Sequence, residues 1–250
     1  PNQEKVARFI EVLYRVYVDY YFAYLEFNPF TFTGEKLVPL DCVAKLDDTA
    51  AYQCAEKWGP IEFPKAFGTT MTKEEAYVKS LDEKTGASLK LTVLNPKGRV
   101  WLLVAGGGAS VIYTDTVVDL GYAKELANYG EYSGDPSTEM TYEYTKTVLD
   151  LMTREPDPKG RGKFLIIGGG IANFTDVANT FTGIIQALEQ YKDRLQKNKV
   201  KIYVRRGGPN YKEGLEKMRR AGEKIGVPVE VYGPETHMTA VVSMALEGGK

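Results

Sequence analysis

The stretch Lys163–Thr175, KFLIIGGGIANFT, decides the predicted fold of this chain. Its unbroken apolar run is typical of a parallel strand buried on both faces of a sheet. The three glycines that follow tolerate positive φ angles and allow close approach to the backbone. Thr175, or Asn173 before it, is a suitable N-cap for an amphipathic helix over Val177–Tyr191. The pattern predicts a strand, a glycine turn and a helix N-terminus that can receive an anion, although such a turn can also bind nothing.

The same succession of strand, turn and helix recurs from Arg99 onward. Strands are predicted at residues 100–104, 126–132, 164–167, 200–204 and 229–232, and each is followed by a predicted helix. This alternation is typical of an α/β fold with a doubly wound parallel sheet and right-handed crossovers. We therefore predict a flavodoxin-like domain over residues 96–250, with the strand order 2-1-3-4-5.

Residues 1–95 follow a different pattern and are predicted to form a separate domain. A helical apolar stripe covers Gln3–Tyr20, and two strand-like segments follow at 22–31 and 37–46. Further along, Asp82 and Thr85 lie in a polar turn after a short predicted helix. These two side chains could approach a nucleotide or a metal ion, but a plain turn is the commoner reason for such residues.

The two strand-like segments are predicted to form a hairpin with a candidate metal site. If the hairpin closes on Gly34 and Glu35, residues whose numbers sum to 69 lie opposite each other. Asn28 then faces Asp41, and Glu26 lies two residues along on the same side. Three oxygen-bearing side chains on one face suit a hard cation such as Mg²⁺, although a solvated polar face is the commoner reason for such a pattern.

The carboxyl ends of the predicted parallel strands share one rim, where open α/β sheets bind ligands. Among the turns of this rim, only the one with Arg205 and Arg206 carries fixed positive charge. Arg206 offers a planar fork that suits a carboxylate. Gly134, Asn173 and Thr175 add a backbone donor, an amide and a hydroxyl. This set favours a small polycarboxylate over a dinucleotide, since the glycine fingerprint with its downstream ribose-binding acid is missing.

Composition excludes several classes of protein. The net charge of −1 indicates no basic surface for nucleic acid. No apolar run is long enough to span a membrane, and the N-terminus lacks a signal-peptide pattern. Cys42 and Cys54 have neither redox-motif nor metal-site spacing, so they are expected to be reduced. We expect a cytoplasmic protein.

Six segments of the chain together resemble the ATP-citrate lyase family. They are FAYLEFNPF, LDCVAKLDDTAAY, GASLKLTVLNPKGRVWLLVAGGGASVIY, ELANYGEYSG, IIGGGIANFTDVANTF and YVRRGGPNY. The resemblance covers nearly the whole chain and extends more weakly to the β subunits of succinyl-CoA synthetase. It implies that residues 1–95 are the C-terminal part of an ATP-grasp domain and that residues 96–250 bind citrate.

The resemblance also implies roles for single residues. Asn28 and Asp41 match metal ligands, Asp41 also matches an ATP-site residue, and Glu26 matches the catalytic carboxylate that meets a phosphohistidine. A further metal contact of the family falls on Asp82, Thr85 and Ala87. The citrate contacts of the family fall on Gly134, Asn173, Thr175, Tyr191 and Arg206.

The family reaction uses ATP, Mg²⁺ and CoA to convert citrate through citryl phosphate and citryl-CoA to acetyl-CoA and oxaloacetate. His237, the single histidine, lacks the glycine- and alanine-rich surroundings of the phosphohistidine. We expect this chain to bind citrate but to be inactive by itself. It would then need a partner subunit or region that carries the phosphohistidine, most of the CoA site and the citrate-synthase-like part. The alternatives are the large subunit of a citryl-CoA synthetase and a non-catalytic citrate-binding module.

Overall fold

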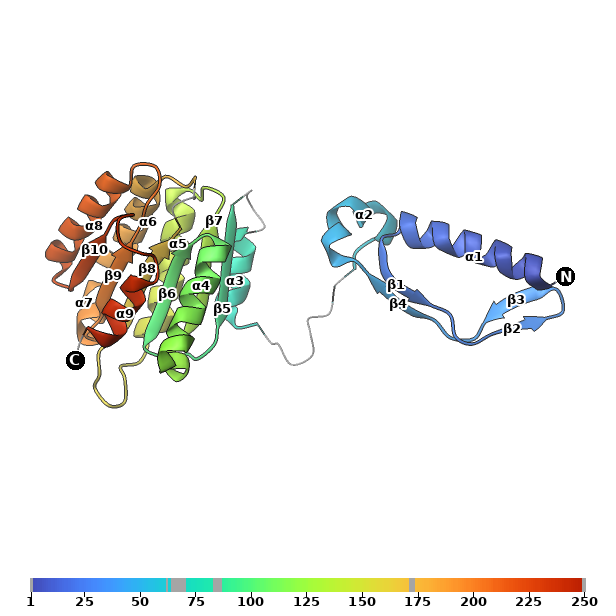
Figure 1. Ribbon diagram of the computed structural model, residues 1–250, viewed down its shortest axis with the longest axis horizontal. Coiled ribbons are helices and arrows are strands. Elements are labelled where there is room, and N and C mark those ends of the chain that lie inside the picture. Colours follow the sequence, from blue (N-terminus) through green and yellow to red (C-terminus); the bar gives the residue numbers. More distant parts are fainter. Residues whose placement is uncertain (1, 62, 64–70, 83–86, 171–173, 249–250) are drawn as a thin grey trace. The chain divides into compact units, whose positions relative to one another are not determined.

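The computed structural model describes residues 2–61, 63, 71–82, 87–170 and 174–248 (Figure 1). The chain divides into two compact units, residues 1–70 and 71–250, and each is described by itself. The division falls earlier than the boundary predicted between residues 95 and 96. Strand β5 (Ser88–Val93) pairs with β7 (Asn128–Ser133) along its whole length, so it belongs to the sheet of the second unit.

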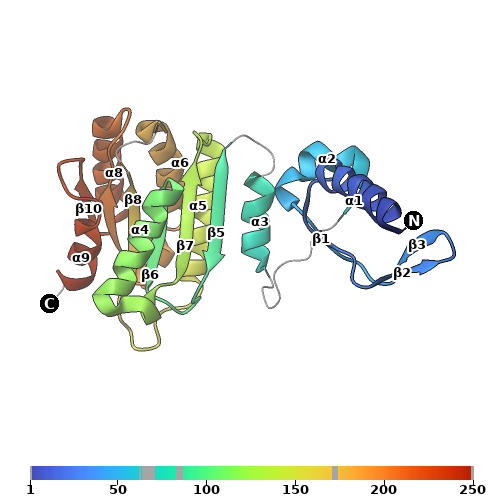
Figure 2. The ribbon, with the colours of Figure 1, turned by 45° about the vertical axis from the view of Figure 1, so that its right-hand side comes forward.

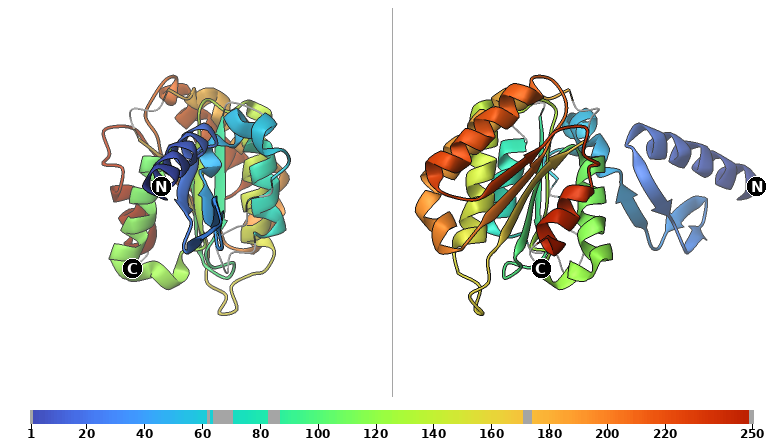
Figure 3. Two further views of the ribbon diagram at one scale, coloured as in Figure 1. Left: turned by 90° about the vertical axis from the view of Figure 1, so that its right-hand side faces the viewer. Right: turned by 60° about the vertical axis from the view of Figure 1, so that its left-hand side comes forward.

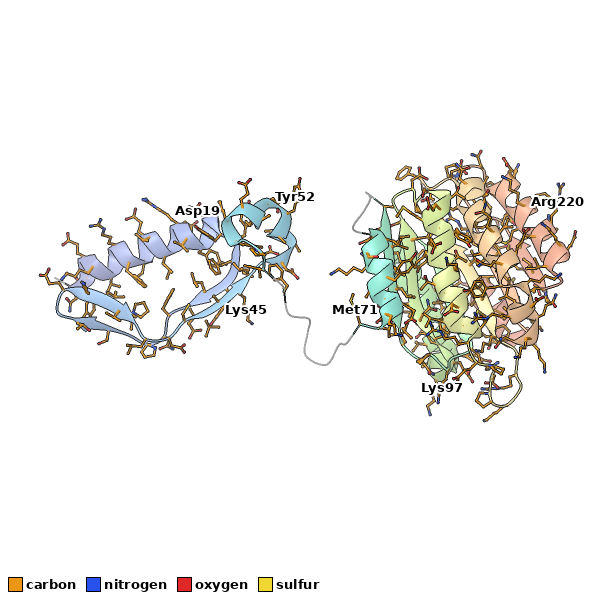
Figure 4. The ribbon with its side chains drawn as sticks, turned by 180° about the vertical axis from the view of Figure 1, so that it is seen from behind. Asp19, Lys45, Tyr52, Met71, Lys97 and Arg220 are labelled. Atoms are coloured by element: carbon orange, nitrogen blue, oxygen red, sulfur yellow. The ribbon has the colours of Figure 1, made fainter. Side chains whose placement is uncertain are left out.

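The described residues of the first unit form two helices, a 3-10 turn and four short strands. These are α1 (Asn2–Asp19), β1 (Phe22–Glu26), β2 (Phe30–Thr33), β3 (Lys36–Pro39), β4 (Val43–Leu46), the turn Asp48–Ala50 and α2 (Ala51–Trp58). The indole nitrogen of Trp58 donates to the carbonyl of Tyr20 at 3.1 Å, and Lys57 Nζ donates to the carbonyl of Asp19 at 2.8 Å. These two bonds tie α2 to the end of α1. Figure 4 labels Tyr52, an exposed side chain of α2.

The predicted hairpin register is found in the strand pairs on both sides of Asn28 and Asp41, but these two residues themselves lie in neither pair. Glu26 is paired with Val43 in the β1–β4 ribbon, and Phe30 is paired with Pro39 in the β2–β3 ribbon, so these pairs have the sum of 69, whereas the register is shifted at Phe22, which pairs with Leu46. Each predicted strand is nevertheless split in two. Only one backbone bond bridges the interruption, from Leu40 N to the carbonyl of Pro29 at 3.0 Å.

The second unit is built on a six-stranded sheet with the order β10-β9-β8-β6-β7-β5 among the described residues. Its remaining strands are β6 (Val100–Ala105), β8 (Phe164–Gly169), β9 (Lys201–Arg205) and β10 (Val229–Tyr232). Leaving β5 aside, all strands are parallel and their order is the predicted 2-1-3-4-5. The antiparallel edge strand β5 was not predicted.

Helices cover both faces of this sheet (Figure 3). One face carries α3 (Lys73–Asp82), α5 (Thr138–Thr153), α6 (Val177–Gln190), α7 (Lys192–Lys197) and α8 (Tyr211–Ile225). The other face carries α4 (Gly107–Val117) and α9 (Ala240–Glu247). Figure 2 shows α3 beside the edge strand β5. Because both faces are covered, every residue of the central strand β6 is buried, as its continuous apolar run predicts.

Helix α6 begins at Val177, as predicted, but a residue other than the two predicted ones caps it. The N-cap of α6 is Asp176, whose carboxylate accepts from Asn179 N at 2.9 Å, and neither Thr175 nor Asn173 fills that position. The N-cap of α5 is Ser137, whose hydroxyl accepts from Met140 N at 3.2 Å. Two residues before this cap, Asp135 has a left-handed backbone with φ of 57°. Asp135 and Thr175 therefore lie outside the helices, in the turns that follow β7 and β8.

Within the described part of the chain, no helix combines the length and the apolar character that a membrane span requires.

Candidate functional site

A cavity of about 420 Å³ opens at the carboxyl ends of β6, β7 and β8. It is lined by Ala105, Gly106, Gly108, Ala109, Ser133, Gly134, Asp135, Gly170, Phe174 and Thr175. Three of the predicted rim turns therefore meet at one hollow, as expected for an open α/β sheet. Gly134 and Thr175, two of the predicted citrate residues, are among these lining residues.

The glycine run at the end of β8 is explained by two large side chains. A Cβ placed on Gly168 would lie 2.6 Å from Cε1 of the Tyr113 ring. A Cβ placed on Gly169 would lie 3.0 Å from Cδ and 3.1 Å from Cζ of Arg206. Since neighbouring residues of a strand point to opposite faces, the Tyr113 ring and the Arg206 side chain occupy opposite faces of the sheet. Both positions thus require glycine for packing.

Arg206 is the residue of this region that most clearly lacks a partner. Its side chain is fully buried, and Nε, Nη1 and Nη2 all lack a hydrogen-bond partner among the described residues. A buried charge without a partner is strongly unfavourable, so such a guanidinium indicates a site for an anion.

Arg205, directly before it, has a structural role. Its guanidinium donates to the carbonyls of Thr236, Gly169 and Pro234 at 2.8, 2.9 and 3.2 Å. Arg205 thereby fastens the segment after β10 to the end of β8. Of the two arginines, Arg206 is therefore the one available to a ligand.

The charges around the cavity are unevenly distributed. Helices α5 and α6 both direct their N-termini to this end of the sheet, where partial positive charge favours an anion. On the α4 side, the carboxylate of Glu131 is 6% exposed and lies against Gly107, the first residue of α4. Glu131 accepts a hydrogen bond from the hydroxyl of Tyr129 at 2.9 Å and has no cationic partner in the described ranges. The α4 N-terminus is thus already faced by a protein carboxylate.

Tyr191 does not join this site. It follows α6 at the helix C-terminus, whereas Thr175 precedes the N-terminus of the same helix. A helix of 14 residues separates the two ends by about 21 Å. Tyr191 instead lines a separate hollow of about 280 Å³ with residues of α3 and α5, and its ring lies 4.9 Å from Cζ of Arg194. Burial raises the pKa of the Tyr191 phenol. Asn173 lies outside the described residues.

The hairpin of the first unit holds the second predicted site. The hydroxyl of Tyr24 donates a short hydrogen bond to Glu26, which raises the pKa of Tyr24. The amide nitrogen of Asn28 donates to the other oxygen of Glu26 at 3.4 Å, which leaves the amide oxygen for another partner. Asp41 Oδ1 accepts from Cys42 N at 2.8 Å, which leaves Oδ2.

The described residues contain no group of three or more His, Cys, Asp and Glu arranged to hold a metal ion. A cation at the hairpin would therefore have the Asp41 carboxylate and the Asn28 amide as protein donors, with water or phosphate oxygens as the others.

The third predicted set is only partly described. Asp82 ends α3, and its carboxylate accepts from Leu89 N at 2.7 Å, which fixes the start of β5. Ala87 lies in a bend directly before β5, and Thr85 lies outside the described residues. The bond to Leu89 gives Asp82 a structural task that the sequence did not reveal.

A family model described as "ATP citrate lyase citrate-binding" matches residues 69–248, which include the whole cavity and Arg206. The chain belongs to this ATP citrate lyase citrate-binding family. The matched range begins close to the boundary of the second unit, so the family corresponds to the six-stranded sheet and its helices.

Full-length relatives are considerably longer than this chain. Mouse ATP-citrate synthase is 58% identical over 245 residues, which cover 98% of this chain and 22% of the relative. A mutant ATP citrate lyase of Methanosaeta concilii, solved with (3S)-citryl-CoA, is 61% identical with a TM-score of 0.89, over 98% of this chain and 60% of that one. The enzyme of Methanothrix soehngenii, solved with citrate and coenzyme A, is 62% identical with a TM-score of 0.87, over 97% and 58% of the two chains.

Sequence reasoning missed the buried polar side chains beneath the cavity. Tyr113 and Tyr132 are fully buried, and their hydroxyls have no hydrogen-bond partner among the described residues. In the sequence, both resemble ordinary core aromatics. The one available signal was the glycine run itself, because adjacent glycines at a strand end also indicate large side chains packed over the backbone.

Proposed function

We propose that the second unit binds citrate in the cavity at the carboxyl ends of β6, β7 and β8. The observation that carries this proposal is the buried guanidinium of Arg206, which has no partner among the described residues. A carboxylate is the matching planar acceptor for that fork. Membership of a citrate-binding family and the citrate-bound relative support the same ligand.

The remaining groups suit the other carboxylates of citrate. Gly134 and Thr175 line the cavity beside the N-termini of α5 and α6. Each helix N-terminus is worth about 0.3–1 kcal/mol towards a negative charge, and about 2 kcal/mol when partly buried. A charged hydrogen bond from Arg206 adds about 1.5–3 kcal/mol. Arg206 therefore dominates recognition, and we assign Asn173 to the same site from the family resemblance.

We further propose that the chain serves as one part of ATP citrate lyase, which forms acetyl-CoA and oxaloacetate from citrate. The relatives carry that name, and they extend well beyond the region matched here. The partner region would then supply the phosphohistidine and most of the CoA site. The two cysteines are free, which suits a cytoplasmic location.

Within this scheme, the first unit contributes to the ATP-dependent step as part of an ATP-grasp domain. Asn28 and Asp41 would hold Mg²⁺, Asp41 would also contact ATP, and Glu26 would meet the phosphohistidine. The register of the flanking strand pairs supports this assignment, because Glu26–Val43 and Phe30–Pro39 both have the predicted sum of 69. When bound, Mg²⁺ supplies charge neutralisation for the transferred phosphate. Asp82, Thr85 and Ala87 are assigned to a metal contact on the resemblance alone.

The citrate proposal is tested by thermal unfolding of the 250-residue chain with and without millimolar citrate. Wild type should gain stability as RT ln(1 + [L]/Kd). Arg206→Lys should weaken citrate by about 10- to 100-fold, because a point charge replaces a fork, and Arg206→Gln should weaken it further. Without citrate, Arg206→Gln should melt no lower than wild type, since it removes a buried unpaired charge.

Arg220→Gln is the matched control. Arg220 lies on α8 (Figure 4), and its guanidinium is paired with Glu216 at 2.9 Å in a largely exposed ion pair. This variant should keep the full citrate response. A citrate response that survives in Arg206→Gln would place the ligand elsewhere.

A further inference from the structure

We propose that Tyr132 is a further citrate-binding residue, whose phenol hydroxyl donates to the carboxylate that Arg206 holds. This role rests on the citrate binding proposed above and adds a residue that the family resemblance does not supply. Tyr132 is the penultimate residue of β7, directly before the cavity residues Ser133 and Gly134.

The sheet register places Tyr132 and Arg206 on either side of one small residue. Ala105 of β6 is paired with Tyr132 on one side and with Gly169 on the other. In-register residues of a parallel sheet point to the same face, and the Arg206 side chain lies over Gly169 on that face. With strands about 4.8 Å apart, the Tyr132 and Gly169 backbones are about 10 Å apart, with Ala105 between them.

The residue between them belongs to the cavity. Ala105 lines it, as does Gly170 directly after Gly169. Its methyl group leaves room above β6 that a larger side chain would fill. A carboxylate seated over Ala105 would therefore have the Arg206 guanidinium on one side and the Tyr132 phenol on the other.

The Tyr132 hydroxyl also makes no hydrogen bond with the described part of the protein. It is fully buried and has no hydrogen-bond partner there, as is the case for the three nitrogens of Arg206. Burial raises the pKa of Tyr132, so the phenol keeps its proton at neutral pH, whereas the positive charge of Arg206 and the neighbouring Thr180 hydroxyl act in the opposite direction. Two unpartnered donors on either side of Ala105, which lines the cavity, indicate a shared acceptor.

A neighbouring tyrosine shows the contrasting case. The ring centroids of Tyr144 and Tyr132 are 6.5 Å apart, and both residues belong to the same core cluster. The Tyr144 hydroxyl, however, donates to the carbonyl of Lys90 at 2.9 Å. Tyr144 thus provides a matched control, because the same chemical change there removes a bond within the protein.

The experiment compares Tyr132→Phe and Tyr144→Phe in the full chain by calorimetric titration with citrate and by thermal unfolding. Tyr132→Phe should raise the citrate Kd by at least about tenfold, because it removes a hydrogen bond to a charged group. Its melting temperature without citrate should equal or exceed that of wild type. Tyr144→Phe should melt about 2–4 °C lower and keep the wild-type Kd within about twofold.

Three outcomes would overturn this role. If Tyr132→Phe binds citrate as wild type does, the hydroxyl does not contact the ligand. If Tyr132→Phe melts lower without citrate, as Tyr144→Phe should, the hydroxyl is part of the fold. If wild type itself does not respond to citrate, the proposed function fails and this role fails with it, whereas the first two outcomes leave the proposed function intact.

Discussion

Replacing Gly169 by alanine should weaken citrate binding through steric displacement of Arg206. The added Cβ would lie 3.0 Å from Cδ and 3.1 Å from Cζ of Arg206, and closer still to Nη1. Ordinary contacts of this kind start at about 3.4 Å, so the guanidinium has to retreat by roughly 1 Å. A fork displaced that far loses at least one charged hydrogen bond to the ligand, which costs about 1.5–3 kcal/mol. The citrate Kd should therefore rise by about 10- to 150-fold.

The assay is thermal unfolding at a fixed, saturating citrate concentration, with Kd measured by calorimetry. A 30-fold rise in Kd removes about 2 kcal/mol of ligand-dependent stabilisation, which corresponds to about 4–8 °C for a unit of this size. Overpacking should also lower the stability of the unliganded chain by about 1–3 kcal/mol.

Gly168→Ala provides the comparison that separates steric damage from loss of the site. The Cβ of this variant meets the Tyr113 ring on the opposite face of the sheet. Its overpacking cost should be similar, but the citrate-dependent shift in melting temperature should be retained. Equal loss of citrate binding in both variants, or normal binding in Gly169→Ala, would refute the reasoning.

Three further perturbations test other parts of the chain. The hydrogen bonds from Arg161 hold the pKa of Asp157 well below its usual value, so its stabilising contribution is present above about pH 4 and is lost at lower pH. Asp157→Asn should accordingly lower the melting temperature at pH 7 and flatten its decline between about pH 4 and pH 2, and an unchanged decline would contradict this. Asn128→Ala should lower the free energy of unfolding in urea by about 2–5 kcal/mol, because the Asn128 amide accepts from the N–H of Leu102 and donates to its carbonyl, both at 2.9 Å. A decrease below about 1 kcal/mol would show that water replaces the amide. Asp41→Asn should abolish ATP-dependent histidine phosphorylation in the assembled enzyme and leave the citrate Kd unchanged, and a parallel loss of both would make Asp41 structural.

The strand order and the hairpin register could be predicted from the sequence because both follow from local patterns. Five apolar runs followed by helices restrict an α/β sheet to few topologies. A hairpin register follows from the turn once Gly34 and Glu35 are placed at its tip. Arg206 could be chosen because it belongs to the only rim turn with fixed positive charge, but distinguishing it from Arg205 required the observed hydrogen bonds.

Other features depend on contacts that a sequence pattern does not contain. Apolar and polar residues alternate along the strand Ser88–Val93, as in a strand with one exposed face. Only its pairing with Asn128–Ser133, however, shows that it belongs to the second unit. Tyr191 matches a family position, but the length of α6 places it far from Thr175. Asp176 caps α6 in place of Thr175, since several residues of the turn have capping side chains and the backbone geometry selects one.

The buried carboxylate of Glu131 makes the electrostatic field across the cavity asymmetric. With this negative charge beneath the α4 wall and the Arg206 cation beneath the α6 side, the cavity acts as a fixed dipole. A polyanion that enters it experiences a torque before any contact forms, because its most charged end is drawn towards Arg206 and repelled by Glu131. Citrate has two chemically identical arms, which only an asymmetric environment can distinguish. The field across this cavity supplies one of the axes of that asymmetry.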